Sequence, residues 1–164
     1  VLADACLQVT RFAAELGVQT MVENHGQFCQ NSERMEKLAN AVADPNFGLL
    51  CDIGNFTDCD EDPILACSRV APYTIYVHAK DFHFKTGMEP YPGFGYYPTR
   101  GGNLLRGAIV GHGFVPIRQC LGILRSAGFD GDVSLEFEGL EEPEFAVGIG
   151  LSNLRRYLRE LDEA

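Results

Sequence analysis

The chain has 164 residues, of which 46% are hydrophobic, and it carries a formal net charge of −10 at neutral pH. This length and composition predict one soluble globular domain. The acidic balance argues against a nucleic-acid partner, because such a surface needs clustered Lys and Arg. No apolar run approaches the roughly 18 residues of a membrane span, and the first residues do not resemble a signal peptide. We therefore expect a cytoplasmic protein without a membrane partner.

The cysteines form no CxxC pair, which argues against a zinc site or a disulfide framework. Several of them lie on apolar helix or strand patterns, where cysteine behaves as a small buried hydrophobic residue. We expect reduced thiols at all six positions: Cys6, Cys29, Cys51, Cys59, Cys67 and Cys120.

Helical and strand patterns alternate along the first half of the chain. An apolar stripe of helical period stops at Gly17, and a second helix has Asn31 and Ser32 as capping candidates. Asp62 followed by Pro63 marks the start of a third, short helix. The expected elements are a helix over 1–17, a strand over 18–24, a helix over 31–45, a strand over 47–55, a helix over 60–72 and a strand over 73–81.

The second half begins with residues 82–113, which are dense in Gly, Pro and aromatics and show no clear period. We expect an irregular loop there, of the kind that is usually functional or disordered. A helix over 115–129, a strand over 131–139 and a helix over 142–161 follow. This order predicts an α/β fold with parallel strands joined by right-handed crossovers. Both an open doubly wound sheet and part of a (β/α)8 barrel fit, and no glycine-rich phosphate loop supports a nucleotide-binding version.

Each predicted strand delivers an ionisable residue near its C-terminal end, where α/β proteins build their sites. These residues are Glu23, Asp52 and His78, with Glu136 and Glu138 both on the last strand. Carboxylates with one imidazole suit a divalent ion such as Mn, Mg, Co or Zn, and without a cation they would repel one another. Glu136 and Glu138 share one face of their strand, so spacing alone leaves open which of them is the ligand.

Five segments occur together in an order and spacing that resemble the xylose isomerase-like barrels, the sugar-phosphate isomerase/epimerase superfamily. They are MVENHG, LLCDIGN, YVHAKD, RGAIVGHGFVPI and DGDVSLEFEG. The resemblance covers residues 1–164 and implies a single partial domain, the half of a TIM-type barrel that holds strands five to eight with their helices. Four parallel strands cannot close a barrel, so it also implies a missing N-terminal half or a homo-oligomer.

The resemblance implies a metal-dependent isomerase or epimerase of carbohydrate metabolism that acts on a ketose or aldose, with or without a phosphate. Its metal ligands fall on Glu23, Asp52, His78 and Glu136. Glu23 and Glu136 would also be the acid/base pair that moves a proton through an enediolate.

The resemblance also indicates substrate-binding candidates beside these ligands. Asn55 stands where many ketose epimerases have a histidine, and the arginine that commonly follows the metal histidine is Arg106 or Arg100. Asp81 and His83 are expected to be loop residues. The candidates are His25, Asn55, Lys80, Arg106 and Glu138.

Three other readings remain open. An inosose-type dehydratase would use the same scaffold, and a truncated barrel would act only as a binding or assembly module. An apurinic endonuclease is a weaker candidate, because it needs additional metal ligands and the acidic charge does not suit DNA.

Overall fold

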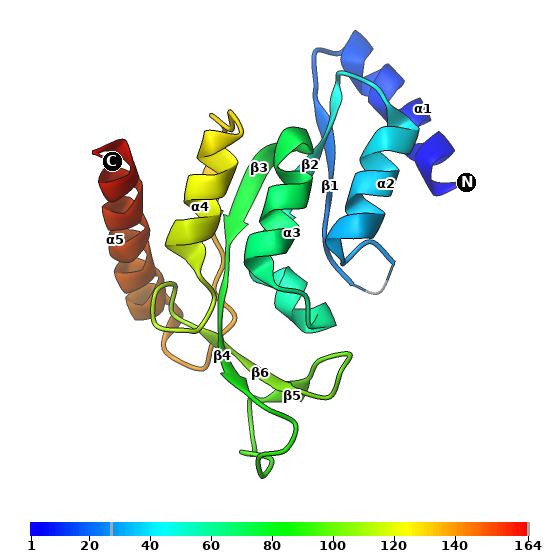
Figure 1. Cartoon of the computed structure of the whole chain (residues 1–164). Coiled ribbons are helices and arrows are strands. Elements are labelled where there is room, and N and C mark those ends of the chain that lie inside the picture. The colour runs from blue at the N-terminus through cyan, green and yellow to red at the C-terminus, as the bar shows by residue number, and fades with distance from the viewer. Residues whose placement is uncertain (27, 164) are drawn as a thin grey trace.

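Helices and parallel strands alternate in the computed structural model, which describes residues 1–26 and 28–163 (Figure 1). The sequence pattern therefore predicted the main elements in their correct order. The helices are α1 (Leu2–Glu15), α2 (Ser32–Val42), α3 (Pro63–Val70), α4 (Ile117–Ser126) and α5 (Pro143–Asp162), with short 3₁₀ helices η1 (Asn55–Cys59) and η2 (Ala71–Tyr73). The strands are β1 (Thr20–Glu23), β2 (Phe47–Asp52), β3 (Thr74–Ala79), β4 (Asp81–Lys85), β5 (Tyr97–Pro98), β6 (Leu104–Ala108) and β7 (Val133–Leu135).

Local capping explains where several helices begin. Asn31 accepts a hydrogen bond from the backbone N–H of Arg34 at 3.1 Å, which caps α2. Asp62 accepts from the N–H of Ile64 at 2.8 Å and is followed by Pro63 at the start of α3. The capping positions expected from the sequence are confirmed for both helices.

The main sheet has the order β1-β2-β3-β7, and all of its neighbouring strands are parallel. Asp52 pairs with His78 in the register between β2 and β3, and His78 pairs with Ser134 between β3 and β7. Since the strands are parallel, their C-terminal ends meet at one edge of the sheet. Within residues 1–26 and 28–163, β1 and β7 are the outer strands. The fold is therefore α/β, with a four-stranded parallel sheet.

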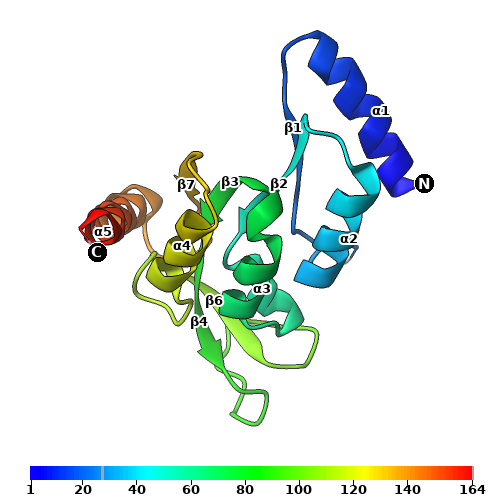
Figure 2. The ribbon, with the colours of Figure 1, turned by 45° about the horizontal axis from the view of Figure 1, so that its top comes forward.

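The helices cover one face of this sheet and pack against one another in chain order (Figure 2). Alternate strand residues such as Leu49, Cys51, Val77 and Ala79 are almost fully buried in the core. His78 lies between Val77 and Ala79 in β3, so its side chain points to the opposite face of the sheet. The burial pattern thus separates an apolar helix side from a face that carries polar groups.

Residues 82–113 are not the irregular loop expected from the sequence. They contribute to a second, antiparallel sheet with the order β4-β6-β5, which extends beyond the C-terminal ends of the parallel strands (Figure 1). The prediction was wrong because these strands are short and separated by turns, so no long period marks them. Buried residues such as Phe82 and Leu105 fix their register against the rest of the fold.

Asp81 and His83 also differ from expectation, because both belong to β4. Asp81 is 1% exposed, and its carboxylate accepts hydrogen bonds from the backbone N–H groups of Gly111, Gly113 and Val115 at 2.8–3.1 Å. Burial raises the pKa of Asp81, although these donors act in the opposite direction. Asp81 therefore anchors the segment that leads into α4.

Candidate metal centre

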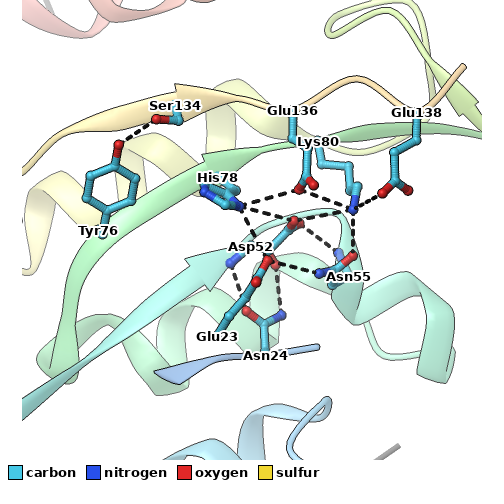
Figure 3. Close-up of polar contacts among 10 residues, drawn as sticks. All are labelled: Glu23, Asn24, Asp52, Asn55, Tyr76, His78, Lys80, Ser134, Glu136 and Glu138. Carbon is cyan, nitrogen blue, oxygen red and sulfur yellow. Dashed lines mark hydrogen bonds and ion pairs between the residues drawn. The ribbon is translucent and has the colours of Figure 1, made fainter. Parts of the chain in front are cut away.

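Four ionisable side chains converge at the C-terminal edge of the parallel sheet (Figure 3). Glu23 and Asp52 are the last residues of β1 and β2, and His78 is the penultimate residue of β3. Glu136 directly follows β7, and its N–H donates to the carbonyl oxygen of Ala79 at 3.0 Å. Four different strands thus deliver one ligand-type residue each to one place.

The donor atoms of this group are close enough to share one ion. His78 Nδ1 lies 3.3 Å from Glu23 Oε1, 3.4 Å from Glu136 Oε2 and 3.9 Å from Asp52 Oδ2. One ligand atom from each of the four residues lies within 4.8 Å of the others. We refer to Glu23, Asp52, His78 and Glu136 as the four-residue group.

Asn24 and Asn55 hold Asp52 in position. The Asn24 side-chain amide accepts from the backbone N–H of Asp52 at 2.7 Å and donates to its carbonyl at 2.8 Å. The N–H of Asn55 donates to Asp52 Oδ1 at 3.0 Å, which leaves Oδ2 directed toward His78. Asp52 is 0% exposed, so its carboxylate has little freedom to turn away.

Lys80 is a buried cation beside the four-residue group. Its side chain is 3% exposed, and Nζ lies 3.2 Å from Glu136 Oε2, 3.2 Å from Glu138 Oε1 and 3.7 Å from Asp52 Oδ2. Burial alone would lower the pKa of Lys80, but the surrounding carboxylates raise it. Lys80 is therefore an ammonium ion that offsets part of the negative charge.

The donor set fits a divalent cation. Asp52 Oδ2 and His78 Nδ1 are buried, and neither makes a hydrogen bond within the described residues. An imidazole nitrogen that faces several carboxylate oxygens needs a proton or a cation between them. Burial raises the pKa of Asp52 well above its usual value, against the attraction of Lys80. Burial also tends to raise the pKa of Glu136, but its contacts with Asp52 and Lys80 lower it overall.

A cavity of about 650 Å³ adjoins the four-residue group. Lys80, Asn55 and Glu138 line it, and each lies against a member of the group or against Lys80. His25, Asp58 and Tyr97 form further parts of its wall. A space of this size accommodates a small sugar-sized molecule.

The family model of the xylose isomerase-like TIM barrel matches residues 1–157. The chain belongs to this family. It therefore has the fold of this family. Its candidate metal-binding group lies at the C-terminal edge of the parallel sheet, where such barrels build their sites.

Solved structures agree with this assignment at the level of the fold. A xylose isomerase domain protein from Planctomyces limnophilus has a TM-score of 0.75 at 21% identity, with 99% of this chain and 53% of that chain covered. A xylose isomerase-like TIM barrel protein from Mycobacterium smegmatis, in complex with magnesium, has a TM-score of 0.74 at 20% identity, with 98% and 50% covered. The 3-keto-D-glucoside 4-epimerase YcjR from E. coli has a TM-score of 0.67 at 16% identity, with 94% and 52% covered.

The chain spans about half the length of these solved structures. Similar structures also include one named as a probable dehydratase. No protein with a curated description matches the chain significantly. Among the described residues, no helix is long and apolar enough to cross a membrane.

The structure of this family member separates two residues that the sequence grouped as alternatives. Arg100 lines the cavity, whereas Arg106 lies outside its lining. Arg106 instead stacks over the Tyr96 ring at 5.7 Å and lies 3.8 Å from Glu141. The other substrate-binding candidates, His25, Asn55, Lys80 and Glu138, all line the cavity.

One structurally important residue, Asn24, escaped the sequence reasoning. Asn24 lies next to Glu23 on the opposite strand face, and only the long-range pairing with Asp52 reveals its role. Tyr97 comes from the segment expected to be a loop, and its hydroxyl donates a hydrogen bond to the Asp58 carboxylate at the cavity wall. The MVENHG segment gives only a weak indication of this role for Asn24, because an asparagine next to a metal ligand is common.

Proposed function

We propose that this chain carries the metal centre of a sugar isomerase or epimerase that moves a proton next to the carbonyl group of a ketose or aldose. The observation that carries this proposal is the meeting of two glutamates, an aspartate and a histidine from four strands around one point. We further propose that Glu23, Asp52, His78 and Glu136 are the ligands of a divalent ion of the Mn, Mg, Co or Zn kind.

Such an ion supplies Lewis-acid polarisation of the substrate carbonyl. Glu23 and Glu136 lie on two sides of His78 Nδ1, at 3.3 Å and 3.4 Å, and are the proposed acid/base pair. Because the pKa of Glu136 is lowered, its side chain is a carboxylate at neutral pH and can accept a proton. The second glutamate then returns a proton, to the same carbon from the opposite face in an epimerisation or to the neighbouring carbon in an isomerisation.

Lys80 and Asn55 are proposed to orient the substrate. Both line the cavity, and Lys80 Nζ lies 3.3 Å from Asn55 Oδ1. An ammonium ion and an amide at this position can hold sugar oxygens while Glu138 keeps Lys80 in place. Arg106 pairs with Glu141 and lies outside the cavity lining, so we do not propose that it orients the substrate.

A dehydratase reaction is the second candidate, and the burial of Lys80 favours it. Lys80 Nζ lies 3.2 Å from Glu136 Oε2, so a cationic acid stands next to the proposed base. This arrangement suits removal of a proton and departure of a neighbouring hydroxyl group. The similar structures include enzymes named for both reaction types.

We propose that the chain forms half of a TIM-type barrel, with residues 1–164 as one partial domain. The outer strands β1 and β7 and the coverage of about half of each solved structure support this. A preceding segment or a second copy of the chain would complete the barrel. The free thiols at all six cysteines are in keeping with the reducing cytoplasm, where we place the protein.

The test combines metal content with proton exchange. Elemental analysis of the purified chain is expected to show one divalent ion per chain, and Glu136→Gln is expected to lose it. Ketoses incubated with the loaded chain in D2O should gain deuterium next to the carbonyl, as measured by NMR. Glu15→Gln, an exposed substitution on α1, serves as the control.

Absence of any bound divalent ion in the presence of excess metal would overturn the proposed metal centre. Metal binding without exchange on any ketose or aldose would instead favour the non-catalytic reading of this chain. Loss of water from the substrate, with no deuterium gained next to the carbonyl of the product, would favour the dehydratase.

A further inference from the structure

The short helix η1 leads from the four-residue group into the wall of the cavity. It begins at Asn55, whose side chain lies 3.3 Å from Lys80 Nζ and 3.5 Å from Glu23 Oε1 (Figure 3). Residues three apart share one side of a 3₁₀ helix and are separated by about 6 Å along its axis. Asp58 therefore lies on the same side of η1 as Asn55, one turn farther along, and both residues line the cavity.

Asp58 is half-buried and forms a hydrogen-bonded pair with Tyr97 of β5. The Tyr97 hydroxyl donates to the Asp58 carboxylate. Burial and the charge of Asp58 raise the pKa of Tyr97, so this hydroxyl keeps its proton at neutral pH. Burial also raises the pKa of Asp58, whereas the hydrogen bond from Tyr97 and the charge of Lys80 favour the ionised carboxylate.

Two further contacts fix this pair in place. The Tyr97 ring meets the Phe82 ring edge to face, with the centroids 6.4 Å apart, and Phe82 is only 1% exposed. The carbonyl of Asp58 accepts a hydrogen bond from the N–H of Arg100 at 3.0 Å, which ties η1 to the turn after β5. The Asp58 carboxylate is thus held in position before any ligand binds, which lowers the cost of binding.

The cationic side chains of the cavity wall are engaged with other groups of the chain. Lys80 Nζ lies 3.2 Å from Glu138 Oε1. Arg34 Nη1 donates to the carbonyl of Phe28 at 3.2 Å, and Arg100 also has partners within the chain. The wall therefore does not require a negative charge from its ligand.

We infer that Asp58, oriented by Tyr97, accepts hydrogen bonds from the hydroxyl groups at the end of the sugar that is remote from the reacting carbonyl. A carboxylate offers about four acceptor positions, and the Tyr97 hydroxyl fills one of them. Sugar hydroxyl groups donate to a carboxylate in charge-assisted hydrogen bonds, whereas a phosphate or carboxylate group at the same place would be repelled. The preferred substrate is therefore a neutral sugar with free hydroxyl groups at that end. The position of the reacting end rests on the proposed function.

The test measures sugar binding to the full chain in excess Mg²⁺ by ligand-observed NMR titration. The tightest-binding of the four D-2-ketohexoses is compared with its 6-phosphate, which changes only the remote end, and with dihydroxyacetone, which lacks that end. The wild type is expected to bind the neutral ketohexose at least about tenfold more tightly than the 6-phosphate, because a charged carboxylate faces the remote end.

Asp58→Asn should weaken ketohexose binding by about tenfold or more, the usual effect of losing a hydrogen bond to a charged group. The same variant should bind the 6-phosphate more tightly than the wild type does and should bind dihydroxyacetone equally well. Tyr97→Phe keeps the carboxylate but not its orienting donor, so it should weaken the ketohexose by a smaller factor and still disfavour the 6-phosphate. Asp130→Asn, at an exposed position after α4, is the matched control and should change nothing.

Equal weakening of all three ligands in Asp58→Asn would assign Asp58 a purely structural role and overturn the subsite. Tighter binding of the 6-phosphate than of the ketohexose by the wild type, or no saturable binding of any ketohexose, would also overturn it. If Asp58→Asn does not fold, Tyr97→Phe decides, and an unchanged ketohexose affinity in that variant would contradict the subsite.

Metal content and deuterium exchange are measured on the same variants. Ketohexose binding that depends on Asp58, without any proton exchange, contradicts the proposed function alone. Proton exchange on a ketohexose that Asp58→Asn binds as tightly as the wild type contradicts the subsite alone.

Discussion

Asp52 is the most deeply buried member of the four-residue group, and its environment explains how a carboxylate is tolerated there. One oxygen accepts the N–H of Asn55, and the other lies 3.7 Å from Lys80 Nζ. Without these partners a buried carboxylate would cost several kcal/mol, so part of the site's stability depends on Lys80. A bound divalent ion would add the remaining compensation.

Asp52→Asn is expected to abolish tight divalent binding while the fold persists, because the amide keeps the shape of the side chain but not its charge. Loss of a ligand should weaken Mn²⁺ affinity by about a hundredfold or more, since even supporting residues contribute up to about that factor. Isothermal titration calorimetry measures the change. Asp130→Asn, at an exposed position after α4, is the control. Equal affinity in Asp52→Asn and the wild type would remove Asp52 from the ligand set.

The affinity for a divalent ion is expected to be lower at acidic pH than at neutral pH. Burial raises the pKa of Asp52 in the absence of an ion. In a fraction of the molecules Asp52 is therefore protonated and must lose this proton before an ion can bind. Affinity should therefore fall as the pH falls through the raised pKa of Asp52, and binding should release protons. Calorimetry in two buffers with different ionisation enthalpies counts those protons. Affinity that does not change across this range would contradict the coupling.

The turn between β2 and η1 depends on a glycine at position 54. A Cβ atom added there would lie 2.6 Å from the carbonyl oxygen of Lys80 and 2.9 Å from its Cβ atom. Gly54→Ala should therefore push β3 away and lower the free energy of unfolding by about 1–3 kcal/mol. Urea denaturation gives the value.

Gly148→Ala is the matched control for this substitution, because nothing lies within 4 Å of the added Cβ atom on α5. It should raise the free energy of unfolding by up to about 1 kcal/mol through helix propensity. If both variants were stabilised, the close approach of Gly54 to Lys80 would not be a constraint in solution.

The β5–β6 turn should loosen in acid. Burial alone would raise the pKa of Asp60, but hydrogen bonds from Thr99, Asn103 and the N–H of Gly101 lower it overall. A carboxylate with a lowered folded-state pKa stabilises the fold above its unfolded pKa of about 4, and this contribution is lost as the pH falls through the folded pKa.

Amide NMR signals of residues 99–103 should therefore move together as the pH falls below about 4, the ordinary range of an aspartate. Asp60→Asn should remove this transition, because the amide does not titrate. A transition of the same size in Asp60→Asn would show that another group controls the turn.

For the whole molecule, the exposed apolar side of α1 indicates association. Leu2, Val9, Phe12 and Leu16 are all at least half exposed and share one side of the helix. A surface of this kind usually packs against another chain or segment. We expect the chain by itself to self-associate as its concentration rises.

Leu16→Lys should weaken this association in sedimentation velocity experiments, whereas Leu65→Lys on α3 should not. The two leucines are exposed to the same degree, at 66% and 68%, so only their location differs. A monomer at every concentration, or equal effects of the two substitutions, would exclude α1 as the contact surface.

Periodicity and local capping along the sequence determined the order of helices and strands, the starts of α2 and α3, and the presence of an ionisable residue near the end of each parallel strand. These features depend on neighbouring residues, so the sequence alone carries them. The ends of parallel strands also share one edge of a sheet, and Glu23, Asp52 and His78 could therefore be grouped with the pair Glu136 and Glu138 before the structure was known.

Only the tertiary structure decided which residues around that group meet. Glu136 rather than Glu138 faces His78, Asn24 clamps the backbone of Asp52, and Arg100 rather than Arg106 lines the cavity. The antiparallel sheet of β4, β5 and β6 was also decided only by the tertiary structure, because short strands form only when distant partners supply their hydrogen bonds. These features depend on register and on contacts between segments remote in the chain, and no local pattern records either.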